Sequence, residues 1–414
     1  MESECDKLDR RNFLKAMGVA GLGSAFAGCK VKEKKEPNAV DPDAAAKPRQ
    51  PEYQPVPRRK LGKTGIEVPV LALGTNRLDN QIILANTLKW GINYWDTAPV
   101  YLEGNTELAI GAYLAKNPSL RKDLFLVTKA SRVTSVAEVE ERLQTSLKRM
   151  NTTYIDLYDG VHQCSDPAQL TDEVKQWAES AKKRGLIRFF GLSTHQNMDQ
   201  TLAAAAKLDW IDAVMTVYNF RLMQNPKMQA AIDACHKAGI GLIAMKTQGL
   251  GQKIESDKDK ELVRHFLDRG FTAGQAKIKL VLQDERISSA CVGMHNLTIF
   301  SSNVAAVLDK TELTAADIAV LEEYARATCG GYCAGCGHIC GSALPDAPFV
   351  SDIMRSLMYY NSYSRKNWAK QLFARIPGAV RDKLLSIDYS IAEFRCPQHL
   401  PIGKLVAEAV EKLA

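Results

Sequence analysis

The stretch LFLVTKASRVTSVAEVEERLQTSLKRMNTTYIDLYDG, residues 124–160, contains two short apolar runs separated by an amphipathic segment. The runs at 124–129 and 155–160 have the length of buried strands, and residues 136–150 carry apolar side chains at helical spacing. A strand, a helix and a second strand in this order form a parallel unit in which the helix covers the sheet. The stretch therefore predicts an α/β fold.

The same alternation continues in both directions, over residues 58–308. Eight such units match the roughly 250 residues of an eight-stranded (β/α)8 TIM barrel. An open doubly wound sheet is the alternative, but its glycine-rich dinucleotide fingerprint is missing after the first run, where GTNRLDN (74–80) follows. The eight runs are VLALG (70–74), INYWD (92–96), LFLVTK (124–129), IDLYDG (155–160), IRFFG (187–191), DAVMTV (212–217), IGLIAM (240–245) and SSACVG (288–293).

Titratable residues stand at the ends of three successive runs. Asp96 closes the second run, Lys129 closes the third, and His162 follows the fourth, with Tyr101 five residues after Asp96. Because the chemistry of such barrels sits at the carboxyl ends of the strands, we expect these side chains on one rim. A buried ammonium needs a partner, which Asp96 would supply. The pair would lower the pKa of Tyr101 and let this phenol donate a proton to a carbonyl oxygen.

Several motifs together resemble those of the aldo-keto reductases: RRKLGKTGIEVPVLALGT (58–75), GINYWDTAPVYLEGNTELAIGAYL (91–114), LFLVTKAS (124–131), IDLYDGVHQC (155–164) and GLIRFFGLSTH (185–195). The resemblance implies hydride transfer between a nicotinamide cofactor and a carbonyl or alcohol substrate. It also implies that Tyr101 is the general acid, that Lys129 and Asp96 tune it, and that His162 orients the carbonyl or shares the proton.

The resemblance further implies cofactor contacts. Ser193 falls where the family holds the nicotinamide carboxamide, with Thr194 in place of the usual Asn, and Asn303 falls where the adenine end is held. Lys246 ends the seventh run near the expected pyrophosphate site, although a solvated lysine is the alternative interpretation.

Two departures from the family pattern concern the same cofactor. Met215 stands where a Gln normally also holds the carboxamide, and Met245 where many members stack an aromatic ring on the nicotinamide. Residues 291–303 contain no Lys or Arg to grip a 2′-phosphate, which requires a cation. Both NAD and NADP therefore remain open.

Residues 309–414 are expected to form a helical, cysteine-rich tail. Thr314, with Asp317 three residues on, predicts the start of a helix that runs to about residue 327. The segment CGGYCAGCGHIC (329–340) then follows, with C-x3-C-x2-C-x3-C spacing that suits a 4Fe-4S cluster. Structural zinc and disulfides are the alternatives. The candidate ligands in this segment are Cys329, Cys333, Cys336 and Cys340.

A fifth cysteine, Cys396 in RCPQHLPIGKLVAEAVEKL (395–413), resembles the last cysteine of a two-cluster ferredoxin-like tail. The three cysteines that normally precede it are replaced by Ser386, Tyr389 and Ala392, so the sequence predicts one cluster at most. Its fourth ligand would be Cys340 or Cys396.

The other end of the chain, DRRNFLKAMGVAGLGSAFAGCK (9–30), has the layout of a twin-arginine export signal over residues 1–29. A short core helix is the alternative. The end of this segment resembles a lipoprotein box, so Cys29 would carry a lipid anchor and residues 30–57 would be a disordered tether. We therefore expect a periplasmic protein, membrane-bound only through Cys29. Because this export route carries folded proteins, it suits a chain that first acquires a cofactor.

The composition, 46% hydrophobic and 24% charged, is that of a soluble globular protein. The net charge of +7 is dispersed among acidic residues with no basic stripe, which argues against a nucleic-acid partner. The partners expected are a small carbonyl or alcohol substrate, such as a sugar, and an electron-transfer partner for the cluster. The competing hypothesis is a non-catalytic binding or electron-transfer protein on the same fold.

Overall fold

The computed structural model describes residues 53–78, 81–251, 257–346 and 349–414. The chain divides into two compact units, residues 1–54 and 55–414. The predicted export signal, Cys29 and most of the predicted tether lie outside the described residues. The end of the predicted tether belongs to the barrel instead, because Val56 is buried and its N–H donates to the carbonyl of Trp90.

Eight parallel strands close into a barrel in the order β10-β3-β4-β5-β6-β7-β8-β9. Each strand coincides with one of the eight predicted runs, which confirms the (β/α)8 fold and excludes the open sheet. The strands are β3 (Leu71–Gly74), β4 (Tyr94–Asp96), β5 (Phe125–Lys129), β6 (Ile155–Val161), β7 (Ile187–Thr194), β8 (Ala213–Val217), β9 (Gly241–Met245) and β10 (Ser289–Gly293).

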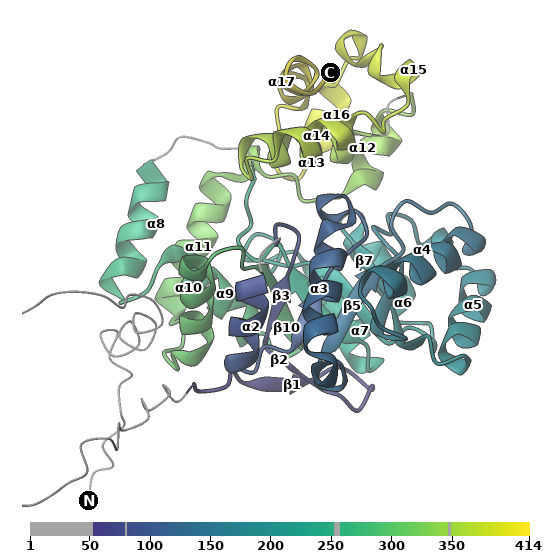
Figure 1. Cartoon of the computed structure of the whole chain (residues 1–414). Helices are drawn as coiled ribbons and strands as arrows, with labels where there is room; N and C mark the ends of the chain where they lie inside the picture. The colour runs from purple at the N-terminus through teal and green to yellow at the C-terminus, as the bar shows by residue number, and fades with distance from the viewer. Residues whose placement is uncertain (1–52, 79–80, 252–256, 347–348) are drawn as a thin grey trace, which may run out of the picture. The chain divides into compact units, whose positions relative to one another are not determined.

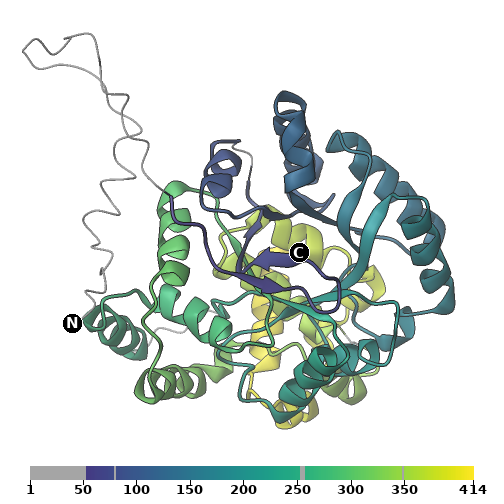
Figure 2. The same ribbon diagram turned by 90° about the horizontal axis from the view of Figure 1, so that it is seen from below.

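A short antiparallel hairpin, β1 (Arg58–Lys60) and β2 (Glu67–Pro69), crosses the amino-terminal end of the barrel (Figure 2). Leu61 and Val68 of this hairpin pack with the barrel interior, so they plug its lower end. Gly62 has a φ of +50°, and a Cβ there would lie 2.2 Å from the carbonyl oxygen of Gly239. A glycine is therefore required where the hairpin turns against the barrel.

Helices surround the barrel (Figure 1). Many begin at a side-chain cap: Ser135 caps α4 and Thr171 caps α5, each accepting a hydrogen bond from a backbone N–H of the first turn. The predicted helix after residue 314 is α11, and Thr314 and Asp317 form its capping box. The helices of this part are α2 (Gln81–Lys89), α3 (Asn105–Lys116), α4 (Val136–Arg149), α5 (Asp172–Lys183), α6 (Met198–Ala205), α7 (Pro226–Lys237), α8 (Asp257–Asp268), α9 (Ala273–Gln283), α10 (Leu297–Leu308) and α11 (Ala315–Ala327).

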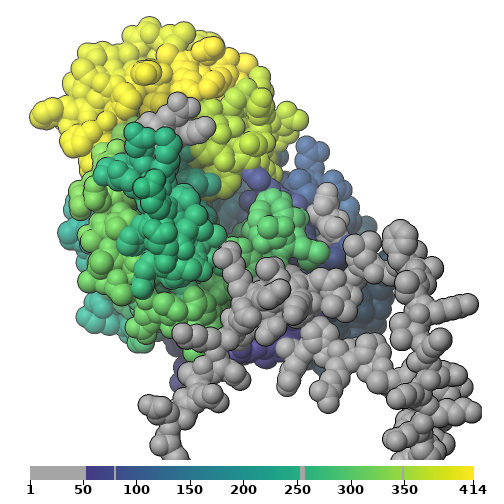
Figure 3. All heavy atoms as spheres, turned by 90° about the vertical axis from the view of Figure 1, so that its left-hand side faces the viewer, coloured from purple at the N-terminus to yellow at the C-terminus, as the bar shows by residue number. Residues whose placement is uncertain are grey.

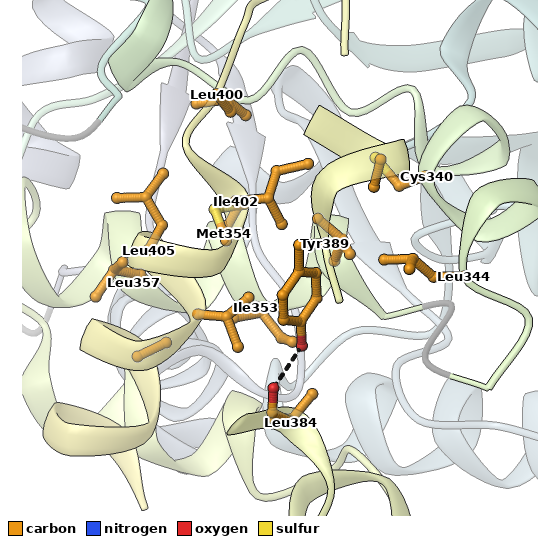
Figure 4. Close-up of a cluster of buried hydrophobic side chains, with 14 of the residues drawn as sticks. Cys340, Leu344, Ile353, Met354, Leu357, Leu384, Tyr389, Leu400, Ile402 and Leu405 are labelled. Atoms are coloured by element: carbon orange, nitrogen blue, oxygen red, sulfur yellow. Dashed lines mark hydrogen bonds between the residues drawn. The ribbon is translucent and has the colours of Figure 1, made fainter. Parts of the chain in front are cut away.

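The tail forms a helical layer with a hydrophobic core of its own (Figure 4). Tyr389 and Ala392, at two of the positions where a second cluster would need cysteines, belong to this core, and the Tyr389 hydroxyl donates to the Leu384 carbonyl. Its helices are α12 (Gly337–Ala343), α13 (Val350–Asn361), α14 (Lys366–Phe373), α15 (Gly378–Arg381), α16 (Ser390–Arg395) and α17 (Ile402–Leu413).

The tail lies at the carboxyl ends of the barrel strands, on the side opposite the hairpin (Figures 1 and 3). Polar contacts join the two parts: the Gln196 amide donates to Asp352 at 2.7 Å, and the Asn219 amide donates to the Tyr332 hydroxyl at 3.0 Å. The tail thus covers the end of the barrel where a catalytic site would lie. Among the described residues, no helix is long and apolar enough to cross a membrane.

Candidate active site

Asp96 and Lys129 meet at the mouth of the barrel. They end the neighbouring strands β4 and β5, and the Lys129 ammonium forms an ion pair with the Asp96 carboxylate. The ammonium also donates to the Thr97 carbonyl oxygen at 2.9 Å, and both side chains are almost completely buried. Burial opposes the charge of Lys129, but Asp96, together with Tyr101 and Asp159, outweighs it, so the pKa of Lys129 lies above its ordinary value. The predicted pairing is present.

Tyr101 lies next to this pair, with its ring centroid 5.7 Å from the Lys129 Nζ. It opens a tight turn in which Leu102 and Glu103 have φ of 46° and 59°, a left-handed conformation that is uncommon for side chains of this size. The pKa of Tyr101 lies above its ordinary value. Burial is the largest cause and the Asp96 carboxylate adds to it, while Lys129 acts in the opposite direction. The expectation of an acidified phenol is therefore wrong, because the effect of burial on this pKa exceeds that of Lys129.

His162 follows β6 and is held by a hydrogen bond of 2.6 Å between its Nδ1 and the Ser131 hydroxyl. Burial, together with the positive charges of Lys129, Arg355 and Arg375, keeps the pKa of His162 well below its ordinary value. The imidazole is therefore neutral at physiological pH.

Asp159 is a buried residue of β6 that sequence reasoning missed. Its Oδ2 has no hydrogen-bond partner in the described structure, and burial raises the pKa of this carboxyl to about 7, opposed by the charge of Lys129 and supported by that of Asp96. Two carboxyls therefore lie within electrostatic range of one ammonium. Its sequence signal is faint, because an aspartate within a strand is also typical of structural hydrogen bonding.

Among the cavities at this end of the barrel, two are lined by predicted catalytic residues. The first, which we call the central cavity, has a volume of about 450 Å³. It is lined by Asp96 and Tyr101, by Asn303 of α10, and by Met215 and Met245 at the two departures from the family pattern. The second, the side cavity, has a volume of about 580 Å³ and is lined by His162. Asp96 and Tyr101 thus line the central cavity and His162 lines the side cavity, whereas Lys129 is buried and lines neither.

The tail supplies part of the wall of the central cavity. Tyr359, Ser362 and Tyr363, at the end of α13 and just beyond it, line this cavity. The Lys246 ammonium donates to the Tyr359 hydroxyl at 2.9 Å. Burial would raise the pKa of Tyr359, but Lys246 outweighs it, with help from Arg355 and Arg365, so this pKa is lowered. Lys246 therefore lines the cavity, but its ammonium is hydrogen-bonded to Tyr359 of the tail. No sequence motif identified Tyr359.

The other three predicted cofactor residues do not all reach the central cavity. Asn303 lines the central cavity, whereas Ser193 and Thr194 are fully buried and line neither cavity. The Ser193 hydroxyl accepts from the Gln163 N–H at 3.2 Å, and the Thr194 hydroxyl lies 2.6 Å from the Cys164 carbonyl oxygen. Both hydroxyls are engaged with the backbone.

Two buried polar atoms on the wall of the central cavity have no partner in the described structure: His195 Nδ1 and Thr247 Oγ1. Buried polar groups are normally hydrogen-bonded, so these atoms are available to a polar ligand. Together with Asn303 at one side of the cavity, they fit a cofactor that carries amide and hydroxyl groups.

The tail cysteines fall into two groups. Cys333, Cys336, Cys340 and Cys396 lie within electrostatic range of one another, and burial followed by the neighbouring thiols raises the pKa of Cys336 to about 12. Cys329 lies instead within range of Arg221. The eight described cysteines are free thiols, and no three His, Cys, Asp or Glu side chains of the described residues are arranged to hold a single metal ion.

A sequence profile of the Aldo/keto reductase family matches residues 71–326 of this chain, well over half of its length. The chain belongs to the aldo/keto reductase family. It is similar to the uncharacterized oxidoreductase YqkF of Bacillus subtilis (strain 168), with 31% identity over 153 residues. These are 33% of this chain and 48% of YqkF, so the chain spans about half the length of that curated relative.

The fold of this aldo-keto reductase is also similar to that of aldo-keto reductase AKR11C1 from Bacillus halodurans, solved in its holo form. The TM-score is 0.55 and the identity 24%, covering 65% of this chain and 96% of that structure. At this identity the similarity shows the barrel fold. The family itself is one of oxidoreductase enzymes, and the tail cysteines, from Cys329 on, lie beyond the matched residues.

Proposed function

We propose that this protein reduces a carbonyl compound, or oxidises the corresponding alcohol, with a nicotinamide cofactor, and that Tyr101 is its acid and base. The observation that carries this proposal is the position of Lys129, between the Asp96 carboxylate and the Tyr101 ring at the barrel mouth. The nicotinamide cofactor would supply the hydride.

Tyr101, Lys129 and His162 would carry out the proton transfer of this reaction. As a hydride reaches the carbonyl carbon, the C=O π bond breaks and its electron pair moves to the oxygen. The Tyr101 hydroxyl gives its proton to that oxygen, and the resulting phenolate is stabilised by Lys129. A raised pKa keeps Tyr101 protonated at neutral pH, which suits the reducing direction. Neutral His162, its Nδ1 held by Ser131, would direct Nε2 toward the carbonyl oxygen.

The central cavity is the proposed cofactor site. Asn303, Thr247 and His195 would contact its polar groups, and Lys246 its pyrophosphate once released from Tyr359. Nothing in residues 291–303 selects a 2′-phosphate, so either NAD or NADP is proposed. Because tail residues form one wall of this cavity, the bound cofactor would exchange slowly.

The tail is proposed to hold one 4Fe-4S cluster through Cys333, Cys336, Cys340 and Cys396, without Cys329. These four thiols lie within electrostatic range of one another, which supports this ligand set. A cluster is wider than one ion, so its ligands need only surround a common space. We expect Cys396→Ser to lower the iron content of anaerobically purified protein and Cys329→Ser to leave it unchanged. Equal iron loss in both variants would contradict this ligand set, and a colourless, iron-free wild type would reject the cluster.

Export by the twin-arginine route, with a periplasmic location and a lipid anchor on Cys29, is also proposed, on the motif at residues 9–30. Mass spectrometry of the mature amino terminus tests it. An acylated Cys29 supports the anchor, and an unmodified terminus elsewhere removes it.

Reduction of a panel of aldehydes and ketones with NADH and with NADPH tests the proposed activity, comparing the wild type with Tyr101→Phe. A tyrosine-to-phenylalanine change removes only the hydroxyl, so we expect turnover to fall by about 10²- to 10⁴-fold. Unchanged turnover would exclude Tyr101 as the acid. Absence of any reduction by the wild type would favour a non-catalytic protein on this fold.

A further inference from the structure

An array of arginines surrounds a single tryptophan of the tail. The guanidinium carbons of Arg365 and Arg375 each lie 5.4 Å from the Trp368 ring centroid, and that of Arg132 lies 5.9 Å away. Trp368 belongs to α14, whereas Arg132 belongs to the loop that follows β5 and Lys129. Barrel and tail therefore contribute cations to one place.

The positive charges of this array are not compensated. Within the described part of the chain, none of the three arginines forms an ion pair with a carboxylate. Burial, followed by repulsion from Arg132 and Arg355, lowers the pKa of Arg375 to about 10, with Asp352 opposing it. Arg355 itself is paired with Asp352 at 2.8 Å. Arg132 and Arg375 are exposed, so solvent screens part of their repulsion, and a bound anion would reduce it further.

Two of these arginines face the proposed reaction site. Arg132 and Arg375 line the side cavity together with His162, and Glu173 is the one carboxylate among the described residues that line it. Two residues that line this cavity have a positive φ: Arg132, with 61°, and Gln163 in the loop after β6, with 62°. Such conformations cost energy in residues other than glycine and are concentrated at functional sites.

We propose that the side cavity seats an anionic group of the substrate, held by the guanidinium groups of Arg132 and Arg375 beside the Trp368 ring. The substrate is then a carbonyl compound, or its alcohol, that carries a carboxylate or a phosphate a few bonds from the reacting carbon. Guanidinium groups bind both anions through paired N–H donors. This inference rests on the proposed reductase activity, because it assigns a specificity to the same site.

Matched substrate pairs test the inference. Succinic semialdehyde is compared with butanal for a carboxylate, and D-glyceraldehyde 3-phosphate with D-glyceraldehyde for a phosphate. In the wild type, kcat/KM for the preferred anionic member should exceed that of its neutral partner by about ten- to a hundred-fold, as expected for a charge-assisted hydrogen-bonded site. The pair that shows the preference identifies the anion.

Variants of the two arginines test whether the preference for the anionic substrate arises at the side cavity. Arg132→Met, Arg375→Met and the double variant should bring the anionic-to-neutral ratio toward one, mainly through a higher KM for the anion. Lys370→Met is the matched control, because Lys370 is an exposed cation on α14, the helix of Trp368, and does not line the side cavity. A ratio near one in the wild type, or an equal loss in Lys370→Met, would overturn the inference while the reductase activity stands.

If the wild type reduces no aldehyde, the proposed activity fails. Anion binding at the side cavity can then be tested without turnover. Calorimetric titration with succinate and with inorganic phosphate then compares the wild type with the double variant. Binding that the double variant loses supports the site, and identical titrations overturn it.

Discussion

The barrel and the tail each place a tyrosine next to a lysine at the central cavity, with opposite results. In the barrel, Lys129 is already paired with Asp96, and the pKa of Tyr101 is raised by burial. In the tail, the phenol of Tyr359 accepts directly from Lys246, and its pKa is lowered. Lys246 forms no ion pair with a carboxylate among the described residues. Lys129 still acts to lower the pKa of Tyr101, but burial and the Asp96 carboxylate outweigh it, whereas at Tyr359 the charge of Lys246, with two arginines, outweighs burial.

This difference assigns different tasks to the two regions. In the proposed reaction, the barrel keeps Tyr101 protonated, as a proton donor to a carbonyl oxygen must be, and supplies a cation to stabilise the phenolate. The tail closes the cavity and presents uncompensated positive charge, from Arg365 and Arg375, beside the site. The proposed chemistry then lies with the barrel, and the proposed cofactor retention and substrate selection involve the tail.

The largest expected effect comes from Lys129→Met. The change leaves the Asp96 carboxylate buried and unpaired, so the free energy of unfolding should fall by about 3–5 kcal/mol in addition to the loss of activity. Because an unpaired buried carboxyl takes up a proton, this loss should be smaller at pH 4 than at pH 8. Urea unfolding at the two pH values measures it. Adding Asp96→Asn should restore stability but not activity, and a stable single variant would contradict the account of the pair.

The tail core is expected to be nearly as sensitive. Leu357 is fully buried there, so Leu357→Ala should lower the free energy of unfolding by about 2–5 kcal/mol. If the tail retains the cofactor, this variant should also release bound cofactor more readily on dialysis. Exposed Leu385→Ala is the control and should change stability by less than about 0.5 kcal/mol. Loss of stability with unchanged cofactor retention would separate the tail from the cofactor site.

A smaller effect is expected from Asp96→Asn alone. Without the carboxylate, the charge of Lys129 acts on Tyr101 unopposed, and the pKa of this phenol should fall by about one unit or more. Spectrophotometric titration of tyrosinate, with the Asp96→Asn/Tyr101→Phe variant as background, measures the change. An unchanged titration would show that burial alone sets the pKa of Tyr101.

The smallest effect concerns Tyr359. Its folded-state pKa is lowered, so the folded protein binds fewer protons than the unfolded chain just below the ordinary tyrosine pKa of about 10. Stability from this group is therefore fully present above that pH and is lost as pH falls through the folded-state pKa. Lys246→Met should remove this alkaline increment in the unfolding free energy. A pH profile that does not change would argue against the pairing of Lys246 with Tyr359.

The parts predicted from sequence are those governed by local pattern. Parallel strands buried on both faces produce continuous apolar runs, so all eight strands were predictable, and the strand ends indicated Asp96 and Lys129. The hairpin β1–β2 was missed because its strands have three residues each and carry charges. The hairpin closes the lower end of the barrel through the packing of Leu61 and Val68, which its short strands do not reveal.

The errors concern long-range packing and its electrostatics. The pKa direction at Tyr101 depends on how deeply the phenol is buried, which residue spacing does not encode. The approach of Tyr359 to Lys246, 113 positions apart, depends on how the tail docks. The approach of Cys396 to Cys333 likewise depends on how the tail folds, and sequence spacing left Cys396 as one of five candidate ligands.

Single-turnover hydride transfer, followed by the nicotinamide absorbance under saturating substrate, tests the assignment of chemistry to the barrel most directly. We expect Tyr101→Phe to slow this step by at least about 100-fold, and Tyr359→Phe, its counterpart from the tail, to slow it by less than about tenfold. Equal losses, or a loss confined to Tyr359→Phe, would contradict the account.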